Sequence, residues 1–167
     1  DPVGVVLVRH ANPLSIVNER DRSYDLAMAG ALSQNERAAL AVLVDTMFPA
    51  DEHGPGAVEL GVLRFIDRGL ATDTPGDLAP IRALANAAIT AAGDVAQLDA
   101  LGPDQREALL ADLDRSHTQA FELLRRRTIE GVFADPAHGG NRDGLGWTLI
   151  GYPGPKGMFT AADQEIA

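Results

Sequence analysis

The chain has 167 residues, which is enough for one domain with a sizeable buried core. It carries 24 acidic and 14 basic side chains, and this formal net charge of −10 disfavours binding to nucleic acid phosphates or anionic lipid. It contains no cysteine, so disulfides, zinc–thiolate sites, iron–sulfur ligation and thiol nucleophiles are excluded from this chain.

Residues 1–32 are predicted to form an N-terminal arm. Val3–Val8 (VGVVLV) is a short apolar, β-branched run that predicts a strand of marginal length. Residues 9–22 are polar and interrupted by Pro13, which favours an extended arm or loop. Because an isolated strand needs a partner, the arm is a candidate for pairing with another chain.

Residues 33–167 are predicted to form a single, mainly α domain of about five helices. Ser33 and Glu36 have the spacing of a capping box, and a stripe of apolar residues follows as far as Phe48. Pro49 is expected to end this first helix. The apolar spacing and the turn residues predict four more helices, over Gly56–Ala71, Leu78–Ala92, Pro103–Leu113 and Ser116–Gly131.

The composition changes after Phe133. Residues 135–157, called the tail below, hold seven glycines, three prolines and the only tryptophan of the chain. The mixture of glycine with large apolar side chains predicts an ordered loop that packs against something. Trp147 could fill the core of its own domain or face a partner, and both remain open. The candidate partner-interface residues are Asn141, Arg142, Trp147, Tyr152 and Pro153.

Three further groups of residues are candidate chemical sites, and each has a weaker sequence signal than the tail. Arg9-His10 at the end of the predicted strand resembles the start of the histidine phosphatase family, in which that His is the nucleophile; phosphoester hydrolysis is therefore the alternative function. The later strand and second catalytic His of that family are not recognisable. His53 and His138 each lie near acidic residues, but without the fixed spacing of a metal site. Arg125–Arg127 lies on a predicted helix, where salt bridges are expected before phosphate binding.

Two blocks of the sequence resemble the gluconate 2-dehydrogenase subunit 3 family, the small or gamma subunit of membrane-bound sugar and sugar-acid dehydrogenases. One block runs from Leu43 to Leu70 and the other from Thr128 to Gly154. The motifs that carry the resemblance are Phe48-Pro49-Ala50-Asp51, Gly54-Pro55-Gly56-Ala57, Phe65-Ile66-Asp67, Thr128-Ile129-Glu130-Gly131, Asp135-Pro136, Gly139-Gly140-Asn141-Arg142-Asp143-Gly144, Gly146-Trp147 and Gly151-Tyr152-Pro153-Gly154. The arm has no counterpart in this resemblance.

The resemblance implies a helical, non-catalytic subunit that accompanies a large FAD-dependent dehydrogenase of the glucose–methanol–choline type, often with a cytochrome c subunit. The flavin belongs to the partner, so no cofactor, metal or catalytic residue is expected in this chain. The family implies export by the twin-arginine route to the periplasm or cell envelope, and a role in the maturation, export or stability of the flavin subunit. No direct membrane span is expected, because no run of the sequence approaches the roughly 20 apolar residues that one needs.

Overall fold

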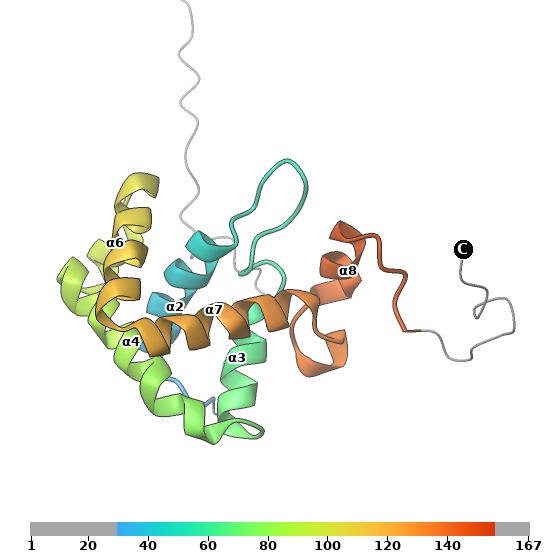
Figure 1. Ribbon diagram of the computed structural model, residues 1–167, viewed down its shortest axis with the longest axis horizontal. Coiled ribbons are helices and arrows are strands. Elements are labelled where there is room, and N and C mark those ends of the chain that lie inside the picture. Colours follow the sequence, from blue (N-terminus) through green and yellow to red (C-terminus); the bar gives the residue numbers. More distant parts are fainter. Residues whose placement is uncertain (1–29, 156–167) are drawn as a thin grey trace, which may run out of the picture. The chain divides into compact units, whose positions relative to one another are not determined.

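The computed structural model describes residues 30–155. Within that range the chain forms seven α-helices and no β-strand, which confirms the mainly α fold (Figure 1). The expected strand over Val3–Val8 and the Arg9-His10 pair lie outside the described residues. The helices are α2 (Gln34–Met47), α3 (Val62–Ala71), α4 (Leu78–Ala92), α5 (Val95–Asp99), α6 (Pro103–Ser116), α7 (Thr118–Phe133) and α8 (Leu145–Leu149).

Helix α2 begins at the predicted capping box. The Glu36 amide donates to the Ser33 hydroxyl at 3.3 Å, and the Ser33 amide donates to the Glu36 carboxylate at 2.7 Å. Burial raises the pKa of Glu36, but these hydrogen bonds from Ser33 and the nearby Arg82 guanidinium outweigh it and hold that pKa below its ordinary value. Glu36 also pairs with Arg82 of α4 at 3.2 Å, so the cap joins two helices.

Helix α2 lies at the centre of the helical unit, in contact with α3, α4, α5, α6 and α7. Its Leu40 and Val44 are completely buried. Helix α4 presents Ala85 and Ala88, also completely buried, and these small side chains let it approach its neighbours closely. Leu124 of α7 completes this layer, so the core is built from aliphatic rather than aromatic side chains.

The helix predicted from Gly56 to Ala71 begins later than expected, at Val62. Residues 57–61 form turns, and Gly61 adopts a left-handed conformation with φ of 79° that interrupts the helical geometry. A Cβ atom at Gly61 would lie 2.8 Å from the Gly139 carbonyl oxygen. The helix is therefore shortened where the tail approaches its N-terminus.

The other predicted helices are close to the observed ones. Helix α4 has the predicted bounds, α6 extends three residues beyond the predicted end at Leu113, to Ser116, and α7 ends at Phe133 rather than Gly131. The short helix α5 was not predicted; Asp94 caps it by accepting a hydrogen bond of 2.7 Å from the Gln97 amide. None of the helices within residues 30–155 is long and apolar enough to cross a bilayer.

Candidate partner-docking surface

The described part of the tail, residues 135–155, folds back on the C-terminal end of α7. Its residues contain two short 3-10 turns, Pro136–His138 and Arg142–Gly144, followed directly by α8. In Figure 1 this orange segment lies beyond the C-terminal end of α7, with α8 above the two turns. The glycine-rich segment is thus a folded element of the helical unit, and the short helix within it was not predicted.

The tail satisfies carbonyl groups that the end of α7 leaves without helical partners. The Asn141 amide donates to the Gly131 carbonyl at 2.8 Å, and the Asn141 side-chain amide donates to the Ala134 carbonyl at 2.8 Å. The Trp147 indole Nε1 donates to the Phe133 carbonyl at 2.9 Å. These three bonds make the tail the C-terminal cap of α7.

Glycine allows the tail to approach α7 backbone against backbone. A Cβ atom on Gly146 would lie 1.9 Å from the Val132 carbonyl oxygen, and one on Gly140 would lie 2.2 Å from the Gly131 carbonyl oxygen. Both distances are far inside van der Waals contact, and the opposing atoms are main chain and cannot move aside. Glycine is therefore required at both positions for this docking.

The structure assigns Asn141 to this internal contact. The residue is completely buried, with φ of 44°, and its side-chain oxygen accepts a hydrogen bond of 2.7 Å from the Gly146 amide. Asparagine tolerates the left-handed conformation better than most residues, and here each end of its side-chain amide has a partner. Its burial leaves no surface for a partner chain, so the predicted partner contact rests on its neighbours.

The tail also contacts the loop that precedes α3. The Arg142 amide donates to the Leu60 carbonyl at 3.0 Å, which holds the second 3-10 turn against this loop. A Cβ atom on Gly54 would lie 2.4 Å from Leu149 Cδ2, so the loop backbone packs directly on α8. The two blocks of sequence that carry the family resemblance are therefore in contact with one another.

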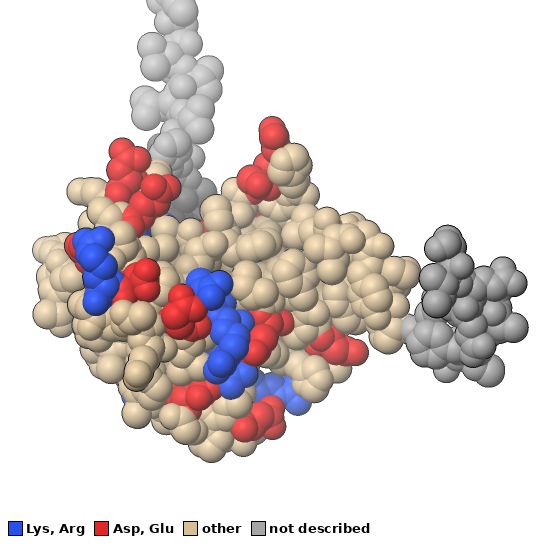
Figure 2. Space-filling view, in the orientation of Figure 1, with Lys and Arg blue, Asp and Glu red and all other residues tan. Residues whose placement is uncertain are grey.

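The tail exposes several large apolar and aromatic side chains around α8. Ile150 is 60% exposed, Tyr152 44% and Leu145 40%, and Pro153 is also exposed. The Trp147 and Tyr152 rings meet edge to face, with centroids 5.4 Å apart. Figure 2 shows that the surface over α8 carries no charged side chain in this view. Of the predicted interface residues, Tyr152 and Pro153 are thus exposed, Trp147 is half-buried in contact with Tyr152, and Arg142 is half-buried.

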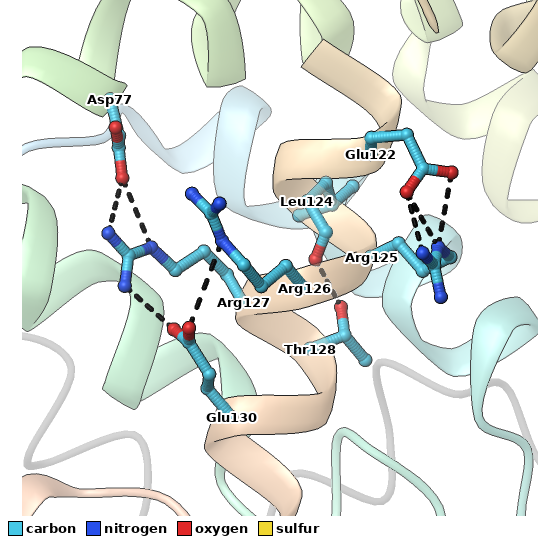
Figure 3. Close-up of polar contacts among 8 residues, drawn as sticks. All are labelled: Asp77, Glu122, Leu124, Arg125, Arg126, Arg127, Thr128 and Glu130. Atoms are coloured by element: carbon cyan, nitrogen blue, oxygen red, sulfur yellow. Dashed lines mark hydrogen bonds and ion pairs between the residues drawn. The ribbon is translucent and has the colours of Figure 1, made fainter. Parts of the chain in front are cut away.

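The arginine run of α7 is engaged in ion pairs, as its helical placement predicted. Arg125 pairs with Glu122 at 2.6 Å, Arg126 with Glu130 at 3.8 Å, and Arg127 with both Asp77 at 2.5 Å and Glu130 at 2.7 Å. Figure 3 shows Arg126 and Arg127 on one side of the helix, near Glu130, and Arg125 on the other side with Glu122. Arg126 and Arg127 meet at a carboxylate, that of Glu130, and Arg125 is held apart by Glu122, so the geometry does not favour a phosphate site there.

A shallow depression of about 710 Å³ lies along the outer face of α7. Arg125, Arg126 and the 44% exposed Ile129 line it, together with Pro80 of α4. Its floor is one helix with alternating charges, and its polar side chains already pair with one another. Among the described residues, no group of three or more His, Asp or Glu side chains could hold a metal ion. The ion pair of His53 is with one carboxylate, that of Glu52, at 3.6 Å.

These features define a helical domain whose distinctive element is a glycine-packed tail with an apolar outer face. The family model described as "Gluconate 2-dehydrogenase subunit 3" matches residues 34–154, and the chain belongs to that family. The matched range runs from the first residue of α2 to Gly154 in the tail. No curated protein and no solved structure matches the chain. Family membership identifies the chain as an accessory subunit of a dehydrogenase complex, with a dehydrogenase as its partner.

Proposed function

We propose that the chain is the non-catalytic small subunit of a FAD-dependent sugar or sugar-acid dehydrogenase complex. It supports the maturation, export or stability of a large flavin subunit of the glucose–methanol–choline type, which binds FAD and oxidises the substrate. A cytochrome c subunit completes some complexes of this kind and would carry the electrons onward. The complex works in the periplasm or cell envelope.

The observation that supports this proposal most directly is the tail. Residues 135–155 put Ile150 and Tyr152 on the surface while the Trp147 indole and the Asn141 amide are used for internal hydrogen bonds. Exposed apolar and aromatic side chains on a rigid support are typical of protein interfaces. The same segment is part of the region that the family model matches.

The test is purification of the native protein with its partners. A tagged chain, expressed in its source organism, should co-purify in fixed stoichiometry with a much larger protein that carries flavin absorbance and reduces a dye in the presence of sugars or sugar acids. After separation in denaturant, the flavin should stay with, or derive from, the larger chain. A native protein that runs as a monomer without a partner would contradict the proposal.

The supporting role has its own measurement. Deleting the gene for this chain should lower the amount of folded flavin subunit in the periplasmic or envelope fraction, while the messenger RNA for that subunit stays constant. Restoring the chain from a plasmid should restore the amount. If the amount and the location of the flavin subunit do not change, the proposed role in maturation, export or stability is wrong.

A further inference from the structure

The loop between α2 and α3 carries an acidic turn at its end. Asp51 and Gly54 exchange backbone hydrogen bonds of 3.1 and 3.3 Å, and the Asp51 carboxylate accepts from the His53 amide at 2.8 Å. The turn is therefore closed by its own hydrogen bonds. Glu52 points outward with a side chain 87% exposed. Residues 51–54 are called the acidic turn below.

The acidic turn is held beside α8. The Gly54 backbone packs on the Leu149 side chain so closely that a Cβ atom would lie 2.4 Å from Leu149 Cδ2. Ile150, the most exposed of the large apolar residues described, follows Leu149 directly. In Figure 2 the red side chains at the end of the loop stand next to the uncharged surface over α8. The acidic turn, which packs on α8 through Gly54, and the exposed tail residues Leu145, Ile150 and Tyr152 are together called the docking face below.

The charge of the docking face selects the kind of partner. Apolar residues exposed on a surface can enter a membrane interface or a protein interface. An anionic membrane would repel both Glu52 and the chain as a whole, whose net charge is −10. A protein surface with an apolar pocket bordered by Lys or Arg would attract the acidic turn and cover Ile150 at once. The negative charge of Glu52 and of the whole chain therefore favours a protein over an anionic membrane as the partner.

The tail part of the docking face is already folded against α7 without a partner. Gly146 and Gly140 fix the tail on the α7 backbone, and the Trp147 indole is tied to the Phe133 carbonyl. Little further ordering of the main chain is needed when a partner covers the face, so most of the binding free energy is retained.

We infer that the docking face binds the dehydrogenase subunit, through an apolar pocket on that subunit that receives Ile150 and Tyr152 and basic side chains that border it and meet Glu52. This inference rests on the proposed function and adds to it the surface and the chemistry of the contact. Ile150 supplies buried apolar area, which governs dissociation. Glu52 supplies long-range attraction, which governs association.

The test measures the affinity of the whole chain and its variants for the purified dehydrogenase subunit by surface-based interferometry at low and high salt. Ile150→Asp should weaken Kd by about tenfold or more, mainly through faster dissociation. Glu52→Lys should weaken it about three- to tenfold at low salt, through slower association, and this difference should shrink at high salt. The matched controls are Ile129→Asp on α7, at a residue 44% exposed, and Glu107→Lys on the exposed face of α6. Both controls should bind like the wild type.

The outcomes separate the docking face from the function itself. If the unaltered chain fails to bind the dehydrogenase subunit, the proposed function fails and this inference falls with it. If the unaltered chain binds and Ile150→Asp binds as tightly as Ile129→Asp, the docking face is wrong and the function stands. Analytical ultracentrifugation tests whether a second copy of this chain binds the docking face instead. A dimer that Ile150→Asp dissociates would assign the face to self-association and overturn the inference. Matching thermal melts of all four variants would show that each is folded.

Discussion

The indole Nε1 of Trp147 donates a hydrogen bond of 2.9 Å to the carbonyl oxygen of Phe133, the last residue of α7. The ring of Trp147 also meets the ring of Tyr152, edge to face. Trp147 thus contributes to its own domain through its indole hydrogen bond, and it also packs against Tyr152, which is exposed at the surface. The partner contact is therefore expected from Tyr152 and Ile150 first, and from Trp147 through the support that it gives them.

Replacing Trp147 should loosen the tail before it unfolds the domain. Trp147→Phe removes the donor to the Phe133 carbonyl and should cost about 1 kcal/mol of local stability. Trp147→Ala also removes the ring and should cost more. Hydrogen exchange is the measurement, since the Gly146 amide bonds to the Asn141 side chain and reports on tail attachment. Faster exchange there with unchanged exchange in α2 and α4 is expected. Equal acceleration in all three regions would make Trp147 a residue of the global core.

The same substitution should also weaken the complex. Trp147→Ala removes the ring against which Tyr152 packs. The affinity of the variant chain for the dehydrogenase subunit should therefore fall by a larger factor than the folding equilibrium constant of the isolated chain. Binding and denaturant titrations on one protein preparation compare the two. A loss of affinity no larger than the loss of stability would contradict the role assigned to the tail.

Gly146→Ala should detach the tail by a steric clash alone. The new methyl group would lie 1.9 Å from the Val132 carbonyl oxygen, a main-chain atom within α7, so the tail must move. A cost of about 2 kcal/mol or more is expected for the docked tail. Trp147 is the only tryptophan, and its fluorescence should shift to the red as it becomes solvated. The control is Gly76→Ala, where nothing lies within 4 Å of the added methyl, and emission there should not change.

The helices could be predicted because their signals are local. Ser33 and Glu36 are three residues apart and need only each other to form the cap, and the apolar stripe that follows Ser33 shows which face of α2 is buried. Pro103 in the first turn of α6 and the alanine-rich pattern of α4 act in the same way. The resemblance to the family also came from sequence, since the tail composition is unusual.

The packing of the tail could not be predicted, because its cause lies far away in the chain. Gly146 is glycine on account of Val132, and Gly61 breaks a helical pattern on account of Gly139. A sequence pattern shows that glycine is present but not which backbone approaches it. For the same reason Asn141 was assigned to a partner interface, although its amide is used to cap α7. An exposed and a buried asparagine look alike in sequence.

Arg127 should matter more than its two neighbours. Its side chain is 20% exposed and bridges Asp77, at the start of α4, and Glu130 of its own helix. Burial lowers the pKa of Arg127, but the hydrogen bonds that its guanidinium donates to these carboxylates outweigh it and raise that pKa above its ordinary value. Arg127→Met should cost about 1 to 2 kcal/mol in urea denaturation, because it leaves the partly buried Asp77 carboxylate without its cation and Glu130 with only the longer contact to Arg126.

Arg125→Met is the matched control for this ion pair. Arg125 makes its contact with Glu122 in full solvent, where water competes for both groups, so no measurable change in stability is expected. The difference between the two arginines should also persist in high salt, because screening acts mainly on exposed pairs. Equal effects of the two substitutions would mean that the Asp77 bridge contributes nothing beyond a surface pair.

Asp45 should make the protein less stable as the pH rises, in contrast to most acidic residues. Its carboxyl lies on α2 beside the loop that precedes α3, where burial raises its pKa and Glu59 adds to the rise; Arg106 and a hydrogen bond from the Val58 backbone oppose it. A raised pKa means that the folded state holds the proton more tightly than the unfolded state. The stabilising contribution is thus complete below the unfolded pKa of aspartate, about 4, and is lost as pH rises through the higher folded pKa.

Asp45→Asn removes the charge but keeps an oxygen that can accept the Val58 hydrogen bond. Unfolding free energy at pH 7 should therefore rise by a few tenths to about 1 kcal/mol, and the advantage should disappear near pH 3. Chemical denaturation across pH 3 to 8 measures both curves, with Glu107→Gln on the surface of α6 as a substitution expected to leave the pH dependence unchanged. A variant less stable than the wild type at pH 7 would show that attraction to Arg106 outweighs the burial of Asp45.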